Sequence, residues 1–249
     1  MRMERDLISH IAHGDHPIAS PISEAHIDRL LTRAKLPKGA RILDLGCGEA
    51  AWTLRALALY PDATADGVDI SPHALRSAAE AAEERGVTDR IRLHQVSATE
   101  FTGEEPYDLV FCSGATHAFG GLVPTMEGIA RFLRPGGLAL VGEGFWEVPP
   151  TPEALAELVD DPDDYADLAG TVARAESAGY VTVYAHTSER GEWDDYEWSW
   201  TGTLLRWAEE NPGPDGAAAR EAALAHRDMW LKGYRGVLGF VSLLLRRTR

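Results

Sequence analysis

The chain has 249 residues, a length that favours one large domain over two separate ones. Hydrophobic residues make up 45% and charged residues 25%, close to ordinary globular usage, which excludes disordered and fibrous proteins. Asp and Glu number 39 against 24 Lys and Arg, and the resulting net charge of −15 argues against a nucleic-acid partner, which would require a basic surface.

Cysteine usage and the N-terminal segment bear on location. Cys47 and Cys112 are too few for a disulfide framework and favour a reducing, cytoplasmic setting. The N-terminal segment MRMERDLISHIAHGDH mixes both charge signs without the apolar stretch of a secretion signal. No run of about 18 apolar residues occurs, so no membrane partner is expected.

The first part of the chain predicts one helix followed by an alternation of strands and helices. The helix is expected to start at Ser23 and to end before Pro37. Its apolar stripe for the core consists of Ile27, Leu30, Leu31 and Ala34. Short apolar runs then predict strands at 42–45, 65–70, 91–96, 107–112 and 138–142. Helical patterns between the runs, at 50–58 and 71–86 among others, indicate crossovers in a mostly parallel sheet.

The pattern changes after residue 142. An acidic helical stretch includes the run 160–164, which is expected to be a solvated helix end, and another helix is expected near 217–230. Two late apolar runs, 180–187 and 238–245, are expected to close the sheet as an antiparallel pair. We therefore predict an α/β fold with a seven-stranded sheet, mostly parallel with an antiparallel last strand, and helices on both faces.

The strongest local motif is LDLGCGEAAWTL, in which a strand enters Gly46-Cys47-Gly48 and then a helix. Glycines let the backbone approach a ligand closely, and the helix N-terminus offers unpaired N–H groups. Asp69 follows Gly48 by 21 residues, at the end of the second predicted strand. A carboxylate at that place can accept two hydrogen bonds from a ribose diol.

The same turn is compatible with a dinucleotide, so the cofactor class depends on its surroundings. Asp44 precedes the first glycine by two residues and is expected to point a negative charge into the space of a pyrophosphate. That charge suits a ligand with an ammonium and a sulfonium. Ala51 also stands where a dinucleotide fingerprint has a third glycine.

On these motifs, residues 40–146 resemble the class I S-adenosylmethionine-dependent methyltransferases. The resemblance implies a Rossmann-like fold, S-adenosylmethionine as cofactor and S-adenosylhomocysteine as product. It divides a single domain, 1–249, into an N-terminal helical lid (1–39), a cofactor-binding core (40–146) and a substrate-side cap with the closing strands (147–249).

The resemblance also implies roles for single residues. The glycine turn faces the methionine part of the cofactor, Asp69 the ribose and Ile70 the adenine. Where the family commonly has Asp-Ala for the adenine edge, this chain has Ser97-Ala98, whose hydroxyl can accept a hydrogen bond. The residues expected to bind the cofactor are Asp44, Gly46, Cys47, Gly48, Trp52, Asp69, Ile70, Ser97, Ala98, Cys112 and Ser113.

The loop after the fourth predicted strand begins at Cys112-Ser113 and contains His117 among glycines. It lies at the carboxyl edge of the sheet, where acceptor and methyl donor are expected to meet. His117 is a candidate general base, since imidazole takes up a proton near neutral pH. The alternative is a histidine that only orients the loop.

Aromatic residues are concentrated in the segment GEWDDYEWSW. An extended chain there would place Trp198 and Trp200 on one face. The segment is read either as an aromatic and acidic wall for the substrate or as a cap on the sheet. The residues expected to contact the substrate are His16, His117, Trp146, Trp193 and Tyr196.

Three N-terminal histidines, His10, His13 and His16, recur at a spacing of three. Gly14 and Pro17 interrupt the helix that would align them, so no metal site is predicted, and a lid over the cofactor is favoured.

The sequence thus predicts methyl transfer from S-adenosylmethionine to a small-molecule acceptor by direct in-line displacement. The alternatives are an NAD-dependent oxidoreductase, which would use the same turn, and a non-catalytic protein that binds S-adenosylmethionine. A protein or tRNA acceptor is a further alternative, although the net charge argues against RNA. The identity of the acceptor and the oligomeric state are left open.

Overall fold

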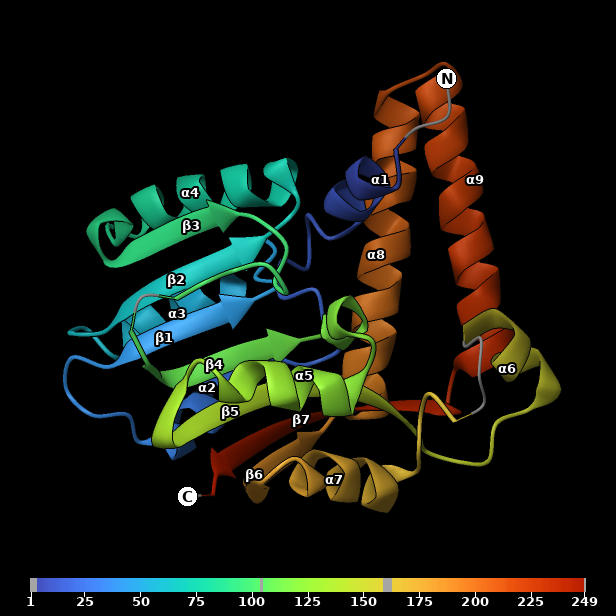
Figure 1. Cartoon of the computed structure of the whole chain (residues 1–249). Coiled ribbons are helices and arrows are strands. Elements are labelled where there is room, and N and C mark those ends of the chain that lie inside the picture. Colours follow the sequence, from blue (N-terminus) through green and yellow to red (C-terminus); the bar gives the residue numbers. More distant parts are fainter. Residues whose placement is uncertain (1–3, 104, 159–162, 249) are drawn as a thin grey trace.

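The computed structural model describes residues 4–103, 105–158 and 163–248. Within these residues one sheet has the strand order β3-β2-β1-β4-β5-β7-β6 (Figure 1). Its strands are β1 (Arg41–Leu45), β2 (Thr64–Asp69), β3 (Ile91–Gln95), β4 (Tyr107–Ser113), β5 (Leu133–Trp146), β6 (Tyr180–Thr187) and β7 (Leu238–Arg247). The predicted run 160–164 lies largely outside the described residues.

The connecting segments are mostly helical. The α-helices are α1 (Arg5–Ala12), α2 (Glu24–Ala34), α3 (Ala51–Leu59), α4 (Pro72–Glu84), α5 (Leu122–Ala130), α6 (Pro152–Leu158), α7 (Leu168–Ser177), α8 (Arg190–Glu210) and α9 (Pro214–Met229). Short turns complete the list: η1 (Thr88–Arg90), η2 (Thr116–Phe119) and the π-helical η3 (Trp230–Tyr234). Among the described helices, none is both long and apolar enough to cross a membrane.

The predicted sheet is confirmed. Strands β1 to β5 pair in parallel, and β7 runs antiparallel between β5 and β6. Strand β5 is longer than predicted because its pairing with β7 continues to Trp146, which lies opposite Leu238. The chain leaves β1 and β4 in opposite directions across the sheet, so their adjacent carboxyl ends form the crevice where α/β folds bind ligands.

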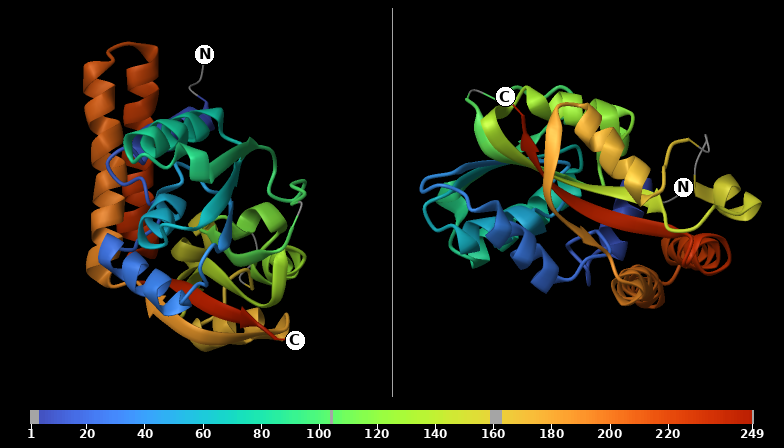
Figure 2. Two further views of the ribbon diagram at one scale, coloured as in Figure 1. Left: turned by 90° about the vertical axis from the view of Figure 1, so that its left-hand side faces the viewer. Right: turned by 90° about the horizontal axis from the view of Figure 1, so that it is seen from below.

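Helices cover both faces of the sheet, as predicted. Helices α2, α3 and α4 bury their apolar residues on one face and α5 and α7 on the other (Figure 2). The predicted stripe of α2 is fully buried, with Ile27, Leu30 and Leu31 inaccessible to solvent. Ser71 caps α4 by accepting from Ala74 N at 3.2 Å. Ser23 instead places its hydroxyl 3.0 Å from His26 Nδ1 and makes no side-chain cap.

The Trp-rich segment is helical and forms the first half of α8, so the shared face considered for an extended chain does not arise. A capping box between Glu189 and Glu192 starts the helix. The buried residues of α8 then follow helical rather than alternating spacing: Glu197, Thr201, Leu204 and Ala208. Trp198 is consequently 51% exposed, whereas Trp200 stacks on His226 at a centroid distance of 3.9 Å.

Helices α8 and α9 form a long antiparallel hairpin beside the carboxyl edge of the sheet (Figure 1). Helix α1 packs against this hairpin through the buried Ala12, which joins Leu204 and Ala219 in one apolar cluster. The N-terminal and C-terminal parts of the chain therefore meet on the side of the sheet where the ligand crevice opens.

Glu192 ties the base of this hairpin to the rest of the molecule. Its Oε1 accepts from Ser23 N and His26 Nδ1, both at 2.7 Å. Its Oε2 accepts from His186 Nε2 at 2.8 Å and Glu189 N at 2.9 Å. Burial alone would raise the pKa of Glu192, but the hydrogen bonds from these four groups lower it to about 2.

Replacing Glu192 with Ala should therefore destabilise the protein by about 3 kcal/mol, since four donors lose their acceptor. At pH 7 this corresponds to a fall in Tm of roughly 10 °C. A carboxyl group with a lowered pKa stabilises the fold above its ordinary value of about 4.5, and this stabilisation disappears as the pH falls toward about 2. Calorimetric melting across this pH range should show that the difference in Tm between the variant and the natural protein becomes smaller as the pH falls.

The exposed Glu209 of the same helix, whose nearest cation is Arg220 at 3.5 Å, supplies the control variant Glu209→Ala. That variant should change Tm by no more than about 2 °C. An equal fall in Tm for the two variants would show that the four hydrogen bonds of Glu192 contribute nothing to stability.

Candidate active site

The turn after β1 has the backbone that the glycines predict. Gly46 and Gly48 adopt left-handed conformations, with φ of 78° and 52°. Gly46 N and Cys47 N donate to Val68 O at 2.8 and 3.0 Å, which fixes the turn to the end of β2. A Cβ on Gly46 would lie 2.5 Å from Ala115 Cβ, whereas a Cβ on Gly48 would meet no atom within 4 Å.

Asp69 holds the turn from the neighbouring strand. Its Oδ2 accepts from Gly48 N at 2.8 Å and its Oδ1 accepts from Ser71 N at 2.9 Å. One carboxylate thus positions both the glycine turn after β1 and the start of the helix after β2. Because a carboxylate has about four acceptor positions, Asp69 keeps capacity for further donors on its cavity side.

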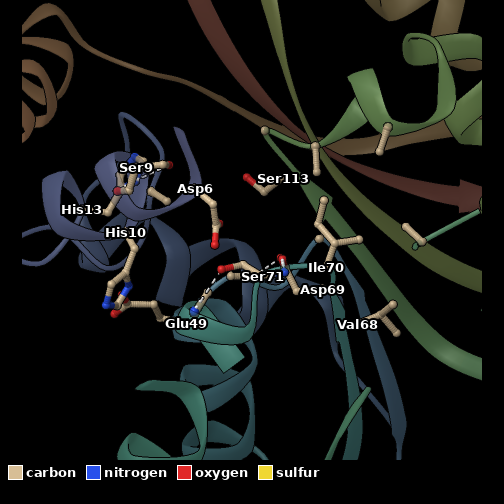
Figure 3. Close-up of a pocket in the computed structure, with 18 of the residues that line it drawn as sticks. Asp6, Ser9, His10, His13, Glu49, Val68, Asp69, Ile70, Ser71 and Ser113 are labelled. Carbon is tan, nitrogen blue, oxygen red and sulfur yellow. Dashed lines mark hydrogen bonds and ion pairs between the residues drawn. The ribbon is translucent and has the colours of Figure 1, made fainter. Parts of the chain in front are cut away.

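A cavity of about 570 Å³, here called the glycine-turn cavity, opens above this turn. The predicted cofactor residues Gly46, Gly48, Asp69, Ile70, Ser97, Ala98 and Ser113 line it. Figure 3 shows Asp6 of α1 pointing toward Ser71 and Asp69, and His10 of α1 lying beside Glu49. The carboxylates of Asp6 and Glu49 add to that of Asp69, so this cavity is acidic.

Other predicted cofactor residues lie away from the cavity wall. Asp44 is 4% exposed beneath the turn, where its Oδ2 accepts from Thr53 Oγ1 at 2.7 Å. Burial raises its pKa to about 7, and the structure places Asp44 beneath the turn rather than pointing into the ligand space as expected. Trp52 packs in the core near Phe111, because its helical position turns inward.

The cysteines are buried as well. Cys112 belongs to the core and Cys47 lies within the turn, its Sγ 3.6 Å from Gly48 O. Burial raises the pKa of both thiols, which keeps them protonated. Neither is among the described residues that line the glycine-turn cavity.

A second cavity, of about 300 Å³ and here called the aromatic cavity, adjoins the first. Its aromatic lining comprises Tyr165, Trp193, Tyr196, Tyr234 and Phe240. Both cavities share the lining residues Ala19, Gly114, His117 and Tyr196.

The predicted substrate residues divide into two groups. His117, Trp193 and Tyr196 line the aromatic cavity. His16 stands behind, with its ring against the edge of Tyr196 at 5.5 Å. The ring of Trp146 makes an edge contact with Tyr165, with 5.4 Å between the ring centroids. Because β5 directs this side chain toward the segment that covers the sheet, Trp146 is not among the described residues that line either cavity. The side chain of His117 is exposed in η2.

Glu143 was missed in the sequence analysis, and Glu197 was considered there only as one of the acids of the segment GEWDDYEWSW. Glu143, near the end of β5, is 7% exposed and lines the aromatic cavity. Burial raises its pKa to about 7. Glu197 of α8 is 1% exposed and accepts from His226 Nε2 at 2.7 Å and Tyr234 Oη at 2.5 Å. The available signal was a lone acid inside an apolar or aromatic run, in GEGFW and in YEWSW.

The N-terminal histidines diverge. His10 Nδ1 contacts Glu49 Oε1 at 3.1 Å, and His13 Nε2 contacts Tyr196 Oη at 3.1 Å. Burial lowers the pKa of His13, which favours its neutral form. In the described part of the chain, the residues whose side chains are arranged as metal ligands are instead three at the base of α8: His26, His186 and Glu192. These side chains already bind one another.

Comparison with known proteins decides the family. A family model described as a methyltransferase domain matches residues 36–210. The chain belongs to the class I S-adenosylmethionine-dependent methyltransferases. The Escherichia coli (strain K12) protein YjhP is 33% identical over 216 residues, which are 86% of this chain and 87% of that protein. Its crystal structure matches with a TM-score of 0.88 at 30% identity, over 96% of this chain and 99% of that chain.

Two further relatives bear on the cofactor and the reaction. A Geobacter sulfurreducens S-adenosylmethionine-dependent methyltransferase, crystallised with S-adenosylhomocysteine, is 29% identical with a TM-score of 0.90 over 99% of both chains. A Methylobacterium nodulans trans-aconitate 2-methyltransferase is 30% identical over 144 residues, 58% of this chain and 54% of that one. The predicted cofactor is confirmed for this methyltransferase, and the nicotinamide alternative is set aside.

The glycine turn of this methyltransferase generates a prediction. Alanine at either Gly46 or Gly48 costs roughly 1–2 kcal/mol for the left-handed backbone. Gly46→Ala also forces a new methyl group into Ala115, so we expect a total loss of about 3 kcal/mol or more for it. Gly48→Ala serves as the matched control. Urea denaturation measures both losses, and equal losses would contradict the close approach at Gly46.

Proposed function

We propose that this methyltransferase transfers the methyl group of S-adenosylmethionine to a small-molecule acceptor by direct in-line displacement. The observation that carries the proposal is the junction of the two cavities at Gly114, His117 and Tyr196. A cofactor above the glycine turn and an acceptor among the aromatic rings would meet there. Proximity and alignment across such a junction supply much of the rate in a methyl transfer.

The lining of the glycine-turn cavity fits the cofactor. Gly48 leaves open space where any side chain would stand, so the methionine part can approach the backbone there. Asp69 uses its remaining lone pairs for the ribose diol. Ile70 is 70% exposed and offers an apolar surface to the adenine. Asp44 and Cys47 support the turn from below.

The residues assigned to the adenine edge differ from the Asp-Ala pair that is common in the family. Ser97 and Ala98 line the cavity after β3. The Ser97 hydroxyl already contacts Thr99 Oγ1 at 2.8 Å, so its contact with an adenine amino group shares that hydroxyl with Thr99. Ser113, which lines the same cavity at the end of β4, contacts Ser20 Oγ at 3.3 Å.

Charge favours this cofactor. The carboxylates of Asp6, Glu49 and Asp69 face a cavity that would receive an ammonium and a sulfonium. Helix α1 brings Asp6 and His10 over the turn, and the contact between His10 and Glu49 holds it there (Figure 3). Helix α2 packs into the core, so we assign the role of a lid over the bound cofactor to residues 4–22, which precede it in the expected N-terminal lid (1–39).

When bound, S-adenosylmethionine supplies a methyl group on a sulfonium, which departs as a neutral thioether. The protein has no need to form a covalent bond, so its residues position the acceptor and exclude water. His117 borders both cavities and is the candidate base for the acceptor proton or the residue that orients the acceptor. Trp193 and Tyr196 enclose the acceptor, with His16 and Trp146 supporting rings of that wall.

The class of acceptor and the setting follow from charge and size. The name of the Methylobacterium relative specifies a small carboxylic acid, which supports a small-molecule acceptor for this chain as well. The net charge of −15 argues against nucleic acid. Cys47 and Cys112 are both unpaired, in keeping with a cytoplasmic location.

Asp69→Ala tests the cofactor site. Two charge-assisted hydrogen bonds to the ribose would be lost, so calorimetric titration should show an affinity for S-adenosylhomocysteine lower by about a hundredfold. Asp62→Ala is the control, because Asp62 is 58% exposed and pairs only distantly with Lys38, at 3.7 Å. Its affinity should match that of the natural protein.

Unfolding of the same variants has to be measured beside the titration, since Asp69 also holds the amides of Gly48 and Ser71. Unchanged affinity in a folded Asp69→Ala protein would contradict the assigned site. Cofactor binding without methyl transfer to any small molecule in a broad acceptor panel would favour the non-catalytic alternative.

A further inference from the structure

The aromatic cavity carries features that the binding of S-adenosylmethionine does not use. Trp193 stands at its centre, with edge contacts to Tyr196 at 6.4 Å, Tyr234 at 6.1 Å and Phe240 at 6.5 Å. Rings in this arrangement present their electron-rich faces or their edges to a guest, and both suit an aromatic ring or an organic cation.

Two carboxylates line this cavity, and they differ in their partners. Glu197 is satisfied, because His226 and Tyr234 donate to its two oxygens. Glu143 accepts from Gly144 N through Oε1 at 3.0 Å, while its buried Oε2 has no donor among the described residues. Buried carboxylates almost always have partners, because an unpaired one costs several kcal/mol.

The positive charges near this cavity do not satisfy Glu143. The described lining contains neither Lys nor Arg, and its histidines are His117 and His226. Arg174 acts on Glu143 only through its electric field, and both residues line an adjoining cavity that shares Thr116, His117, Glu143, Leu158 and Tyr165 with the aromatic cavity. The Thr116 side chain also lowers the pKa of Glu143. An acidic cavity without a cation of its own attracts a positively charged guest.

A second buried polar atom indicates another chemical group that this guest should carry. Trp193 Nε1 also has no acceptor among the residues that the structure describes. An indole N–H is a donor only, so its natural partner is an oxygen of the guest. Glu143, with an unused acceptor, and Trp193, with an unused donor, both line this cavity beside its aromatic walls, and each also lines one neighbouring cavity.

The geometry points to an arylalkylamine bearing an oxygen as the acceptor, with its ammonium bound by Glu143 and its oxygen by Trp193. This inference rests on the proposed methyl transfer and names the substrate class of the same site. It makes Glu143 a catalytic residue that touches the reacting nitrogen, and it gives the buried, unpaired oxygen of Glu143 a partner.

The step balances in atoms and charge. The Glu143 carboxylate takes one proton from the ammonium, which frees the nitrogen lone pair. That lone pair forms the new C–N bond to the methyl carbon as the C–S bond breaks, and the electron pair of the broken bond stays on sulfur. The products are a methylated ammonium and the neutral thioether, and Glu143 then releases its proton to solvent. Burial keeps the pKa of Glu143 at about 7, which suits a group that alternates between the two forms.

The test is a calorimetric titration of the full chain saturated with S-adenosylhomocysteine. The probes are tyramine, 4-ethylphenol and 3-(4-hydroxyphenyl)propionate, which share the phenol ring and differ in carrying an ammonium, no charge or a carboxylate. Tryptamine and 5-hydroxytryptamine, with indole-3-propionate, extend the comparison to a larger ring. We expect the amines to bind about tenfold or more tightly than their neutral or acidic counterparts.

Variants locate the effect. Glu143→Gln keeps the size of the side chain and an acceptor for Gly144 N, so it should fold, bind S-adenosylhomocysteine normally and lose the preference for amines. Glu209→Gln, at an exposed position of α8, should keep the preference. Trp193→Phe should weaken tyramine and 5-hydroxytryptamine more than tryptamine, which has no hydroxyl.

The amine assignment is overturned if the acid or the neutral phenol binds as tightly as tyramine. It is also overturned if Glu143→Gln retains the preference, or if no amine of the panel binds while S-adenosylhomocysteine does. Failure to bind S-adenosylhomocysteine itself would instead reject the proposed function, so the two failures are distinguishable.

Discussion

The hydrogen bond from Gly48 N to Asp69 Oδ2 is the interaction on which the carboxyl edge of the sheet depends. It joins a left-handed turn, which only glycine adopts without strain, to a carboxylate at the end of the neighbouring strand. The second oxygen of Asp69 fixes Ser71, which in turn caps α4. One acidic side chain thus sets the positions of two loops, and the open space at Gly48 follows from them.

The other wall of the site is built by parts of the chain that are remote in sequence. Helix α8 brings Trp193, Tyr196 and Glu197 to the strand ends, and its base is held by Glu192 through α2 and β6. His13 then ties the N-terminal helix to Tyr196. Tyr196 lines both cavities and contacts the N-terminal helix. Under the proposed function, closure over the cofactor would therefore be coupled to the shape of the acceptor site.

The features predicted from the sequence are those that short segments determine. The strands, the cap at Ser71 and the glycine turn each follow from a few adjacent residues. The side-chain directions of Asp44, Trp52 and Trp146 did not follow, because they depend on which face of an element meets the core. The helical Trp-rich segment was signalled by Glu189 and Glu192, but alternating aromatics obscured it. Glu143 was signalled only by its place in the apolar run GEGFW, and β7, which pairs Val241 opposite it, is remote in sequence.

Both cavities are acidic. The glycine-turn cavity presents Asp6, Glu49 and Asp69, and the aromatic cavity adds the unpaired oxygen of Glu143. These negative charges attract a sulfonium more strongly than the neutral thioether that remains after methyl transfer. Under the proposed function, the same walls would therefore hold the methyl donor and release the spent cofactor. An acceptor that is cationic both before and after the reaction is attracted equally in the two states, so the change of charge does not help its release. Its departure then has to depend on exchange of the Glu143 proton with solvent and on opening of the lid at α1.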